Sequence, residues 1–110
     1  METILIPVDQ GKKRNPATIL CDVIMASYNG ARKTHIMYRA NLNPAILEKY
    51  LRFCLENGLI QKENITYRAT RKGVEVARRI EEINTLSKNI EVTKKQVRKL
   101  IVANNFDTLS

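Results

Sequence analysis

The sequence predicts a mainly α-helical (α+β) fold, in which a helix-turn-helix and a short β-hairpin precede a long C-terminal helix. Three observations support this prediction. Two segments open with asparagine followed by proline, the signal of a helix start, at Asn15-Pro16 and Asn43-Pro44. Two short β-branched runs flank Glu63-Asn64. Apolar residues then recur at heptad spacing towards the C-terminus.

The chain has the length of one small domain and a strong excess of basic residues. It contains 110 residues, with 19 Lys and Arg against 11 Asp and Glu, and a formal net charge of +8. This charge favours polyanionic partners, first nucleic acid and then a membrane surface. No apolar run approaches the ~18 residues of a membrane span, and residues 4–8 are too short for a secretory signal. We therefore expect a cytoplasmic, nucleoid-associated protein without a membrane partner.

The sequence offers few residues for catalysis or metal binding. His35 is its single histidine, and neither Cys21 nor Cys54 has a second ligand at metal-binding spacing. We expect both cysteines to be buried free thiols, with a disulfide between them as the alternative. The protein is accordingly expected not to be an enzyme, and to need no metal, no cofactor and no small-molecule ligand.

The first helix is predicted to follow a short strand and a basic linker. Residues 3–8 are β-branched and predict the strand, and residues 11–14 form the linker. The helix begins at Pro16, runs for about 13 residues and stops at Asn29-Gly30. Its apolar positions recur at three-and-four spacing, at Ile19, Leu20, Val23 and Ile24.

Two further helices are predicted close together. A short helix of about seven residues opens at Lys33-Thr34 and breaks at Asn41-Leu42. The next begins at Pro44 and ends at Asn57-Gly58, with one apolar side made of Leu47, Leu51, Cys54 and Leu55. Two helices joined by a three-residue turn have the layout of a helix-turn-helix.

The exposed side of the third predicted helix is the candidate DNA-reading face. A recognition helix uses its N-terminal turns to reach base edges, so the candidates are Asn43, Ala45, Glu48, Lys49 and Arg52. An exposed charged face is also what any surface helix shows, so this pattern alone is not decisive. Lys33, Thr34 and Arg39, on the preceding helix, are candidate phosphate contacts.

The hairpin after the third helix is a candidate wing. Residues 59–62 and 65–68 are expected to pair around a tight turn at Glu63-Asn64. The alternation predicts that Ile65 and Tyr67 point into the core. On the same alternation, Lys62, Asn64, Thr66 and Arg68 are candidate contacts to a minor groove or its phosphates.

Several of these segments resemble one known family. The run 34–43, then Gly58-Leu59-Ile60, then Thr70-Arg71-Lys72-Gly73 occur in order and are similar to archaeal winged-helix DNA-binding proteins that dimerise through a long C-terminal helix. The resemblance covers residues 16–85. It implies a winged helix-turn-helix, a dimer, and a role in transcription regulation or chromosome binding. Asn43-Pro44-Ala45 departs from the Ser-aromatic pair expected there, so no target sequence is carried over.

The last predicted helix follows a cap at Thr70 and extends from residue 71 to about residue 103. It divides the chain into a winged domain, 1–73, and a dimerisation helix, 74–110. The apolar heptad positions, which are the candidate dimerisation residues, are Val76, Ile80, Ile83, Ile90, Val97 and Ile101. A break near Thr93, where a capping box begins, is the alternative.

Two polar residues within that heptad series, Ser87 and Lys94, favour an antiparallel coiled-coil dimer. Parallel chains would set each lysine beside its symmetry mate. Antiparallel chains instead set Ile83 against Lys94 and Ser87 against Ile90, and they bring Val76 opposite Ile101. Each polar residue then packs on an isoleucine.

The function expected from these features is that of a homodimeric double-stranded DNA-binding protein, either a transcriptional regulator or a chromosome-associated protein. Residues 1–73 carry 12 basic and 6 acidic side chains, whereas residues 74–110 carry 7 and 5, so the basic excess lies on the winged domain. The alternative is a winged-helix protein-interaction module in a transcription or replication complex. RNA binding is a third possibility, but we expect no exposed aromatic side chains that would stack single-stranded bases.

Overall fold

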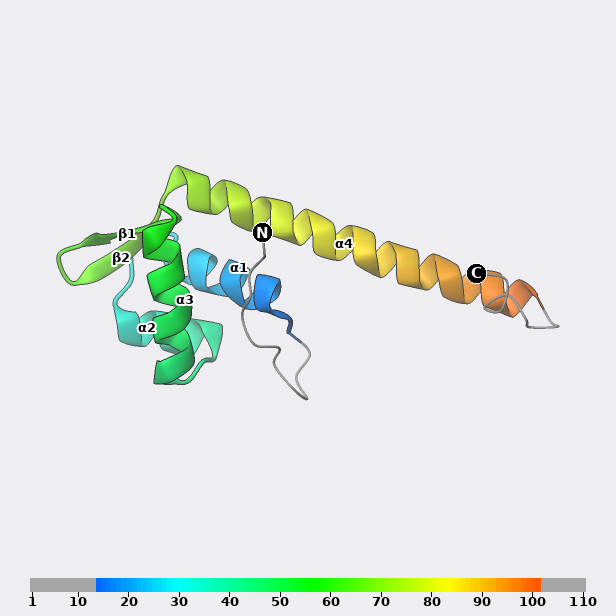
Figure 1. Cartoon of the computed structure of the whole chain (residues 1–110), viewed down its shortest axis with the longest axis horizontal. Coiled ribbons are helices and arrows are strands. Elements are labelled where there is room, and N and C mark those ends of the chain that lie inside the picture. The colour runs from blue at the N-terminus through cyan, green and yellow to red at the C-terminus, as the bar shows by residue number, and fades with distance from the viewer. Residues whose placement is uncertain (1–13, 102–110) are drawn as a thin grey trace.

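A computed structural model of the chain describes residues 14–101. In order, its elements are α1 (Pro16–Ala26), α2 (Lys33–Ala40), α3 (Pro44–Glu56), β1 (Ile60–Glu63), β2 (Thr66–Ala69) and α4 (Arg71–Leu100). The three short helices and the hairpin gather at one end, and α4 leaves them as a long rod (Figure 1). The predicted strand at residues 3–8 lies outside the described residues.

The predicted helix starts are confirmed. The side-chain oxygens of Asn15, Asn43 and Thr70 each accept a hydrogen bond from a backbone amide in the first turn of α1, α3 and α4, at 2.8, 2.8 and 3.0 Å. The end of α1 comes earlier than expected. It stops at Ala26, and both the amide and the hydroxyl of the buried Ser27 donate to the carbonyl of Ile24.

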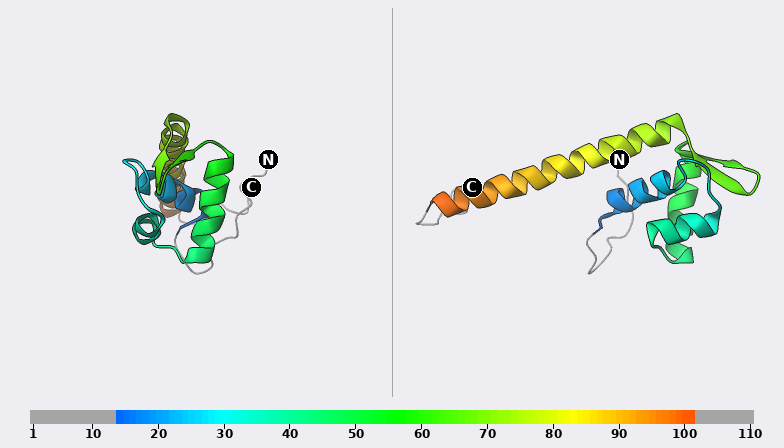
Figure 2. Two further views of the ribbon diagram at one scale, coloured as in Figure 1. Left: turned by 90° about the vertical axis from the view of Figure 1, so that its left-hand side faces the viewer. Right: turned by 180° about the vertical axis from the view of Figure 1, so that it is seen from behind.

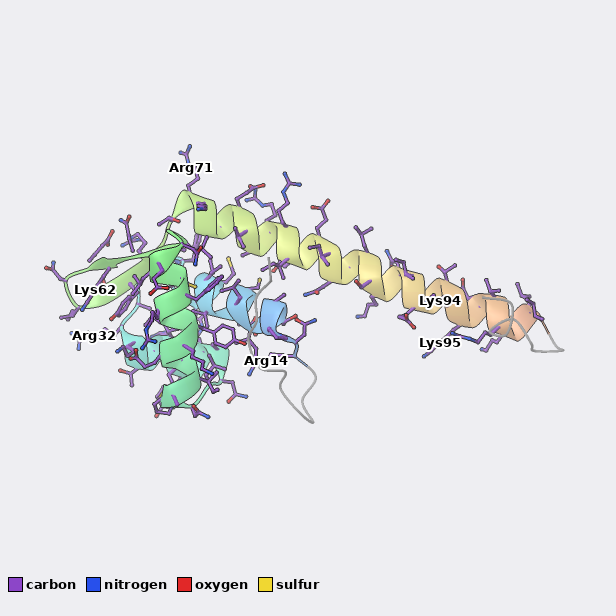
Figure 3. The ribbon with its side chains drawn as sticks, viewed as in Figure 1. Arg14, Arg32, Lys62, Arg71, Lys94 and Lys95 are labelled. Carbon is purple, nitrogen blue, oxygen red and sulfur yellow. The ribbon has the colours of Figure 1, made fainter. Side chains whose placement is uncertain are left out.

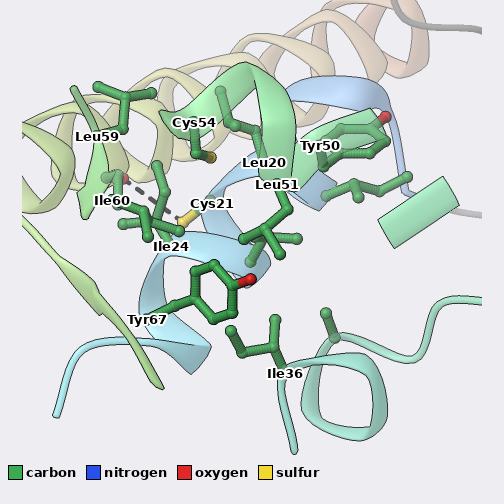
Figure 4. Packing of buried hydrophobic residues seen from close by; sticks show 14 of the residues in the cluster. Leu20, Cys21, Ile24, Ile36, Tyr50, Leu51, Cys54, Leu59, Ile60 and Tyr67 are labelled. Atoms are coloured by element: carbon green, nitrogen blue, oxygen red, sulfur yellow. Dashed lines mark hydrogen bonds between the residues drawn. The ribbon is translucent and has the colours of Figure 1, made fainter. Parts of the chain in front are cut away.

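One hydrophobic core joins all the elements of the winged part (Figure 4). The apolar side of α1 lies at its centre, and α3 contributes Leu47, Leu51 and Cys54 as predicted. The fourth residue predicted for that side, Leu55, is exposed, and Tyr50 is buried instead. The correction has a geometric cause: Tyr50 lies about 40° from Cys54 around the helix, whereas Leu55 lies about 100° from it on the opposite edge of the apolar side.

The turn of the hairpin comes one residue later than predicted, so each residue of β1 pairs two positions further along β2 than expected. Lys62 lies opposite Tyr67 and Glu63 opposite Thr66, so the turn is at Asn64 and Ile65. Asn64 has a φ of 58°, which asparagine tolerates better than most residues. Tyr67 is buried as expected, but the prediction for Ile65 was wrong: it sits in the turn and is 60% exposed.

Helix α4 is continuous for 30 residues, so the alternative of a break near Thr93 is wrong. Its first half packs along α1, where the thiol of Cys21 donates to the carbonyl of Ala77 at 3.6 Å. Further along, the amide of Asn84 donates to the hydroxyl of Thr18 at 3.1 Å. The helix then continues past α1 (Figure 2). The Cα radius of gyration is therefore 17.7 Å, compared with about 13 Å for a compact domain of similar size.

The apolar heptad positions of α4 divide into a group that packs on its own chain and an exposed group. Ile80 is only 8% exposed and Val76 is half-buried, because both pack against the core of their own chain. These two predicted dimerisation residues therefore already have packing partners within one chain. Ile83, Leu86 and Ile90 are exposed, and on average they lie about 70° around the helix from Val76 and Ile80.

The two cysteines give a simple test of this packing. Burial raises the pKa of the Cys21 thiol to about 11 and that of the Cys54 thiol to about 12, so each is almost wholly protonated and unreactive near pH 8. Both are free and buried. We expect a thiol reagent to label the native protein slowly, at the same rate with or without reductant, and quickly in denaturant. Fast labelling of the native protein would contradict this core.

Candidate nucleic-acid interface

The outer face of α3 brings together most of the predicted reading residues. Ala45, Glu48, Lys49 and Arg52 are all exposed, opposite the apolar side that packs on the core. Asn43 is also exposed, but its side-chain oxygen already accepts the capping hydrogen bond from the amide of Ile46. The remaining base-edge candidates on α3 are Lys49 and Arg52, whose cationic groups make no ion pair within residues 14–101.

Arg14 supports the helix-turn-helix from outside it. Its guanidinium pairs with Asp22 of α1 at 3.0 Å, and donates to the carbonyls of Ala40 and Asn41 at 2.6 and 3.1 Å. These carbonyls end α2, where a cation is favourable. The sequence reading placed Arg14 in a basic linker and missed this role, because its partners are up to 27 positions away.

Lys33 and Glu48, both predicted to contact DNA, pair with each other. The Lys33 ammonium donates to the Glu48 carboxylate across α2 and α3. This hydrogen bond lowers the pKa of Glu48 and raises the pKa of Lys33. Both side chains remain about half exposed. Glu48 is the one acidic residue among the α3 candidates, and Lys33 neutralises it. The net positive charge of the candidate face of α3 therefore comes from Lys49 and Arg52.

The wing candidates fall on two faces of the hairpin. Lys62 lies opposite Tyr67 on the core side, with its ammonium 5.6 Å from the centroid of the tyrosine ring. Arg68 lies on the other side, where its Nε donates to Glu63 at 3.1 Å. Glu63 also accepts from Gln61, and these two hydrogen bonds lower its pKa. Lys62 and Arg68 were expected to act together, but they lie on opposite faces. Lys62 pairs with Tyr67 and shares its face, and Arg68, the next residue, points the other way.

Thr66 and Asn64 lie at the tip of the hairpin. Thr66 is half-buried, with its hydroxyl donating to the carbonyl of Glu63 at 3.0 Å. Asn64 is exposed in the turn. Of these two candidates, only Asn64 presents its side chain freely.

Arg32 is a further basic residue at this interface. Ala31 exchanges two backbone hydrogen bonds with Tyr67, at 2.7 and 2.9 Å, so the chain before α2 lies beside the hairpin. Arg32 and Lys62 consequently lie on the same side of the molecule (Figure 3). The sequence reading missed Arg32 because the bridge joins segments far apart in the chain.

The exposed side of α2 holds the remaining candidates. Thr34 is exposed, and within residues 14–101 no side chain caps the first amides of α2. Arg39 is exposed and lies 3.3 Å from the ring nitrogen of His35. Contrary to expectation, aromatic side chains are exposed: Tyr38 by 77% and Tyr28 by 51%. Tyr28 lies in the turn after α1 and Tyr38 lies on α2. The spacing of the apolar residues did not predict that these two rings are exposed.

The described residues contain neither a metal-binding cluster nor a membrane helix. Within residues 14–101, no group of three His, Cys, Asp or Glu side chains is placed to hold a metal ion. The helices of the same region are too polar to cross a bilayer.

This arrangement defines a class of protein: a winged helix-turn-helix domain with a long helix appended. The chain belongs to the winged helix-turn-helix family, whose sequence pattern matches residues 13–88. The match includes α1 to β2 and the half of α4 that packs on α1.

A protein of Methanocaldococcus jannaschii, the uncharacterised MJ0290, is 35% identical over 72 residues. That match covers 64% of this chain, which spans about a third (34%) of the relative's length. Among solved structures, Sso10a-2, a DNA-binding protein from Sulfolobus solfataricus, is 27% identical with a TM-score of 0.73. The superposition covers 80% of this chain and 97% of Sso10a-2, more than the winged part alone, so it includes part of α4. The resemblance to archaeal winged-helix proteins is confirmed.

A more distant structure shares the fold alone. Lactococcus lactis ZitR is 19% identical with a TM-score of 0.51, over 99% of this chain and 84% of the other.

Proposed function

We propose that this protein binds double-stranded DNA through the outer face of α3, the start of α2 and the Lys62 side of the wing. One observation carries the proposal: within residues 14–101, neither Lys49 nor Arg52 is held in an ion pair, and both project from the exposed face of a helix-turn-helix. Arginine and lysine at such positions recognise guanine edges and phosphates. The description of Sso10a-2 as a DNA-binding protein supports the same function.

In this proposal, the contacts divide into two kinds. Lys49 and Arg52 read base edges from the major groove, with the small Ala45 allowing close approach. Arg32, Thr34 and the uncapped amides of α2 bind phosphates, and so position the helix. Lys62 and Asn64 reach the adjacent groove from the wing. Lys33 and Arg39 add weaker phosphate contacts, because each already has a partner on the protein.

We further propose that α4, which makes up the described part of the predicted dimerisation segment 74–110, mediates dimerisation. Helix α4 carries an apolar groove of about 340 Å³, lined by Leu86, Ile90 and Val97 with Asn89, Thr93 and Lys94. With Ile83 and Ile101, this stripe continues over five turns of α4. An antiparallel partner covers it and sets Lys94 on Ile83. A basic homodimer with two winged domains fits a transcriptional regulator or a chromosome-associated protein on the nucleoid.

Substituting the two reading residues tests DNA binding. Arg52→Ala or Lys49→Ala is expected to weaken binding of a preferred duplex about tenfold and to relax its sequence preference, because a good base contact is worth about 1–3 kcal/mol. The measurement is fluorescence anisotropy with selected and random duplexes across a salt series. Lys88→Ala is the matched control: it removes the same charge from an exposed site on α4 and should bind like the parent protein.

The outcome also separates the two candidate functions. If Lys49→Ala, Arg52→Ala and Lys88→Ala all bind duplex DNA equally, the assigned face is wrong. A parent protein without salt-dependent duplex binding would favour the protein-interaction module instead.

A further inference from the structure

A second basic surface lies on the other side of the wing from Lys62. The turn after α1, the end of β2 and the first turn of α4 meet there around a groove of about 400 Å³. Its walls include Tyr28, Asn29, Arg68, Arg71 and Val74. The backbone holds these segments together, since the amide of Ala69 donates to the carbonyl of Ser27 at 2.9 Å. The groove is therefore a built feature of the fold and not a gap between loose side chains.

The groove combines one aromatic ring with two cations. Tyr28 is half exposed at its wall. Arg68 uses its Nε for Glu63, and the rest of its guanidinium lies over Gly30. A Cβ at Gly30 would stand 2.9 Å from Nη2 of Arg68, so the glycine lets the guanidinium lie close to the backbone there. Arg71 extends from the first turn of α4 (Figure 3) and has no ion-pair partner within residues 14–101.

We propose that this groove binds one nucleotide unit of a single-stranded nucleic acid, with its base stacked on Tyr28 and its phosphate on Arg68 and Arg71. An aromatic face accepts any unpaired base, and a guanidinium fork matches the phosphate oxygens. Bases within a duplex already stack on their neighbours, so this ring favours an unpaired strand. Asn29 offers an amide beside the ring for the edge of the base. The site is separate from α3, and its ligand differs from the duplex assigned there.

The test uses the full-length protein and two labelled probes, a single-stranded oligothymidylate and a random duplex. Tyr28→Ala is expected to weaken single-strand binding about tenfold, whereas Tyr28→Phe, which keeps the ring, binds like the parent. Arg71→Ala is expected to weaken single-strand binding and to lower its salt slope by about one phosphate contact. Duplex affinity should not change in any of these variants.

Tyr38→Ala is the matched control, because Tyr38 is even more exposed but lies on α2, away from the groove. It should bind the single strand normally. The proposal is overturned if Tyr28→Ala leaves single-strand binding unchanged, or if Tyr28→Phe loses as much affinity as Tyr28→Ala. It is also overturned if duplex binding falls in parallel, since the groove would then belong to the duplex interface.

A competition experiment separates the two sources of a nucleotide. Thymidine 5′-monophosphate should displace the labelled single strand only at a large excess, because it supplies one of several linked units. Displacement at concentrations similar to those of the strand would identify a free nucleotide as the ligand and overturn the single-strand assignment. Arg52→Ala, read with the duplex probe, reports on α3 alone, so failure at one site is distinguishable from failure at the other.

Discussion

Replacing Gly73 with alanine is expected to destabilise the protein, although alanine is the better helix former. Gly73 is buried in the first turn of α4, and a Cβ there would stand 2.0 Å from the carbonyl oxygen of Leu59. Removing a glycine from a helix gains about 1 kcal/mol. Forcing a methyl group into packed backbone costs about 3 kcal/mol, so we expect a net loss of about 2 kcal/mol.

The clash cannot be relieved by a side-chain rotation, because the obstructing atom is backbone. The same carbonyl accepts the amide of Thr70 at 3.0 Å, and the Thr70 hydroxyl donates to the carbonyl of Gly58 at 2.6 Å. Any shift of α4 would break this junction. Urea unfolding measures the effect, with Lys72→Ala at the exposed neighbouring position as the control. A Gly73→Ala protein as stable as the parent would show that α4 can move relative to the end of α3.

The substitution Ile90→Glu is expected to convert the proposed dimer into a monomer. Ile90 lies in the middle of the exposed apolar stripe and is 56% exposed within one chain. A second helix would bury its side chain, and a carboxylate buried there without a partner costs several kcal/mol. The dimer dissociation constant should therefore rise at least about 100-fold. Sedimentation at micromolar concentration measures this change.

Val92→Glu is the matched control, because Val92 is also half exposed but points about 160° away from Ile90. It should sediment like the parent. A parent protein that is already monomeric would remove the dimer. In a background without Cys21 and Cys54, Ile83→Cys combined with Lys94→Cys should cross-link 83 to 94 between antiparallel chains, whereas 83-to-83 cross-linking would show a parallel dimer.

The helix boundaries could be predicted because their causes are local. Asn15, Asn43 and Thr70 each bond to an amide three positions on, so a few neighbouring residues contain the whole signal. The order of the helices and hairpin followed from these boundaries. The continuity of α4 was less certain from the sequence. A capping box at Thr93 satisfies the same local pattern but is outweighed by the surrounding helix.

The remaining features depend on contacts between distant segments. Backbone hydrogen bonds join Ala31 to Tyr67 of the hairpin. The register of the hairpin places Ile65 in the exposed turn. The pairing of Lys33 with Glu48 crosses the turn between two helices. None of these contacts produces a periodic pattern in the sequence. The sequence could therefore predict which residues lie on the candidate face, but not which of them pair with each other.

The hydrogen bond from Asn84 to Thr18 marks the point at which α4 becomes a spacer of fixed length. From Asn84 to Leu100 the helix adds about 24 Å, at about 1.5 Å per residue. In the proposed dimer, this segment acts as a ruler that sets how far apart two winged domains stand. Inserting seven residues after Asn84 would lengthen each arm by about 10 Å and nearly preserve the orientation of the stripe. Inserting two would instead turn the stripe by about 200°, so the ruler tolerates changes in length only in whole heptads.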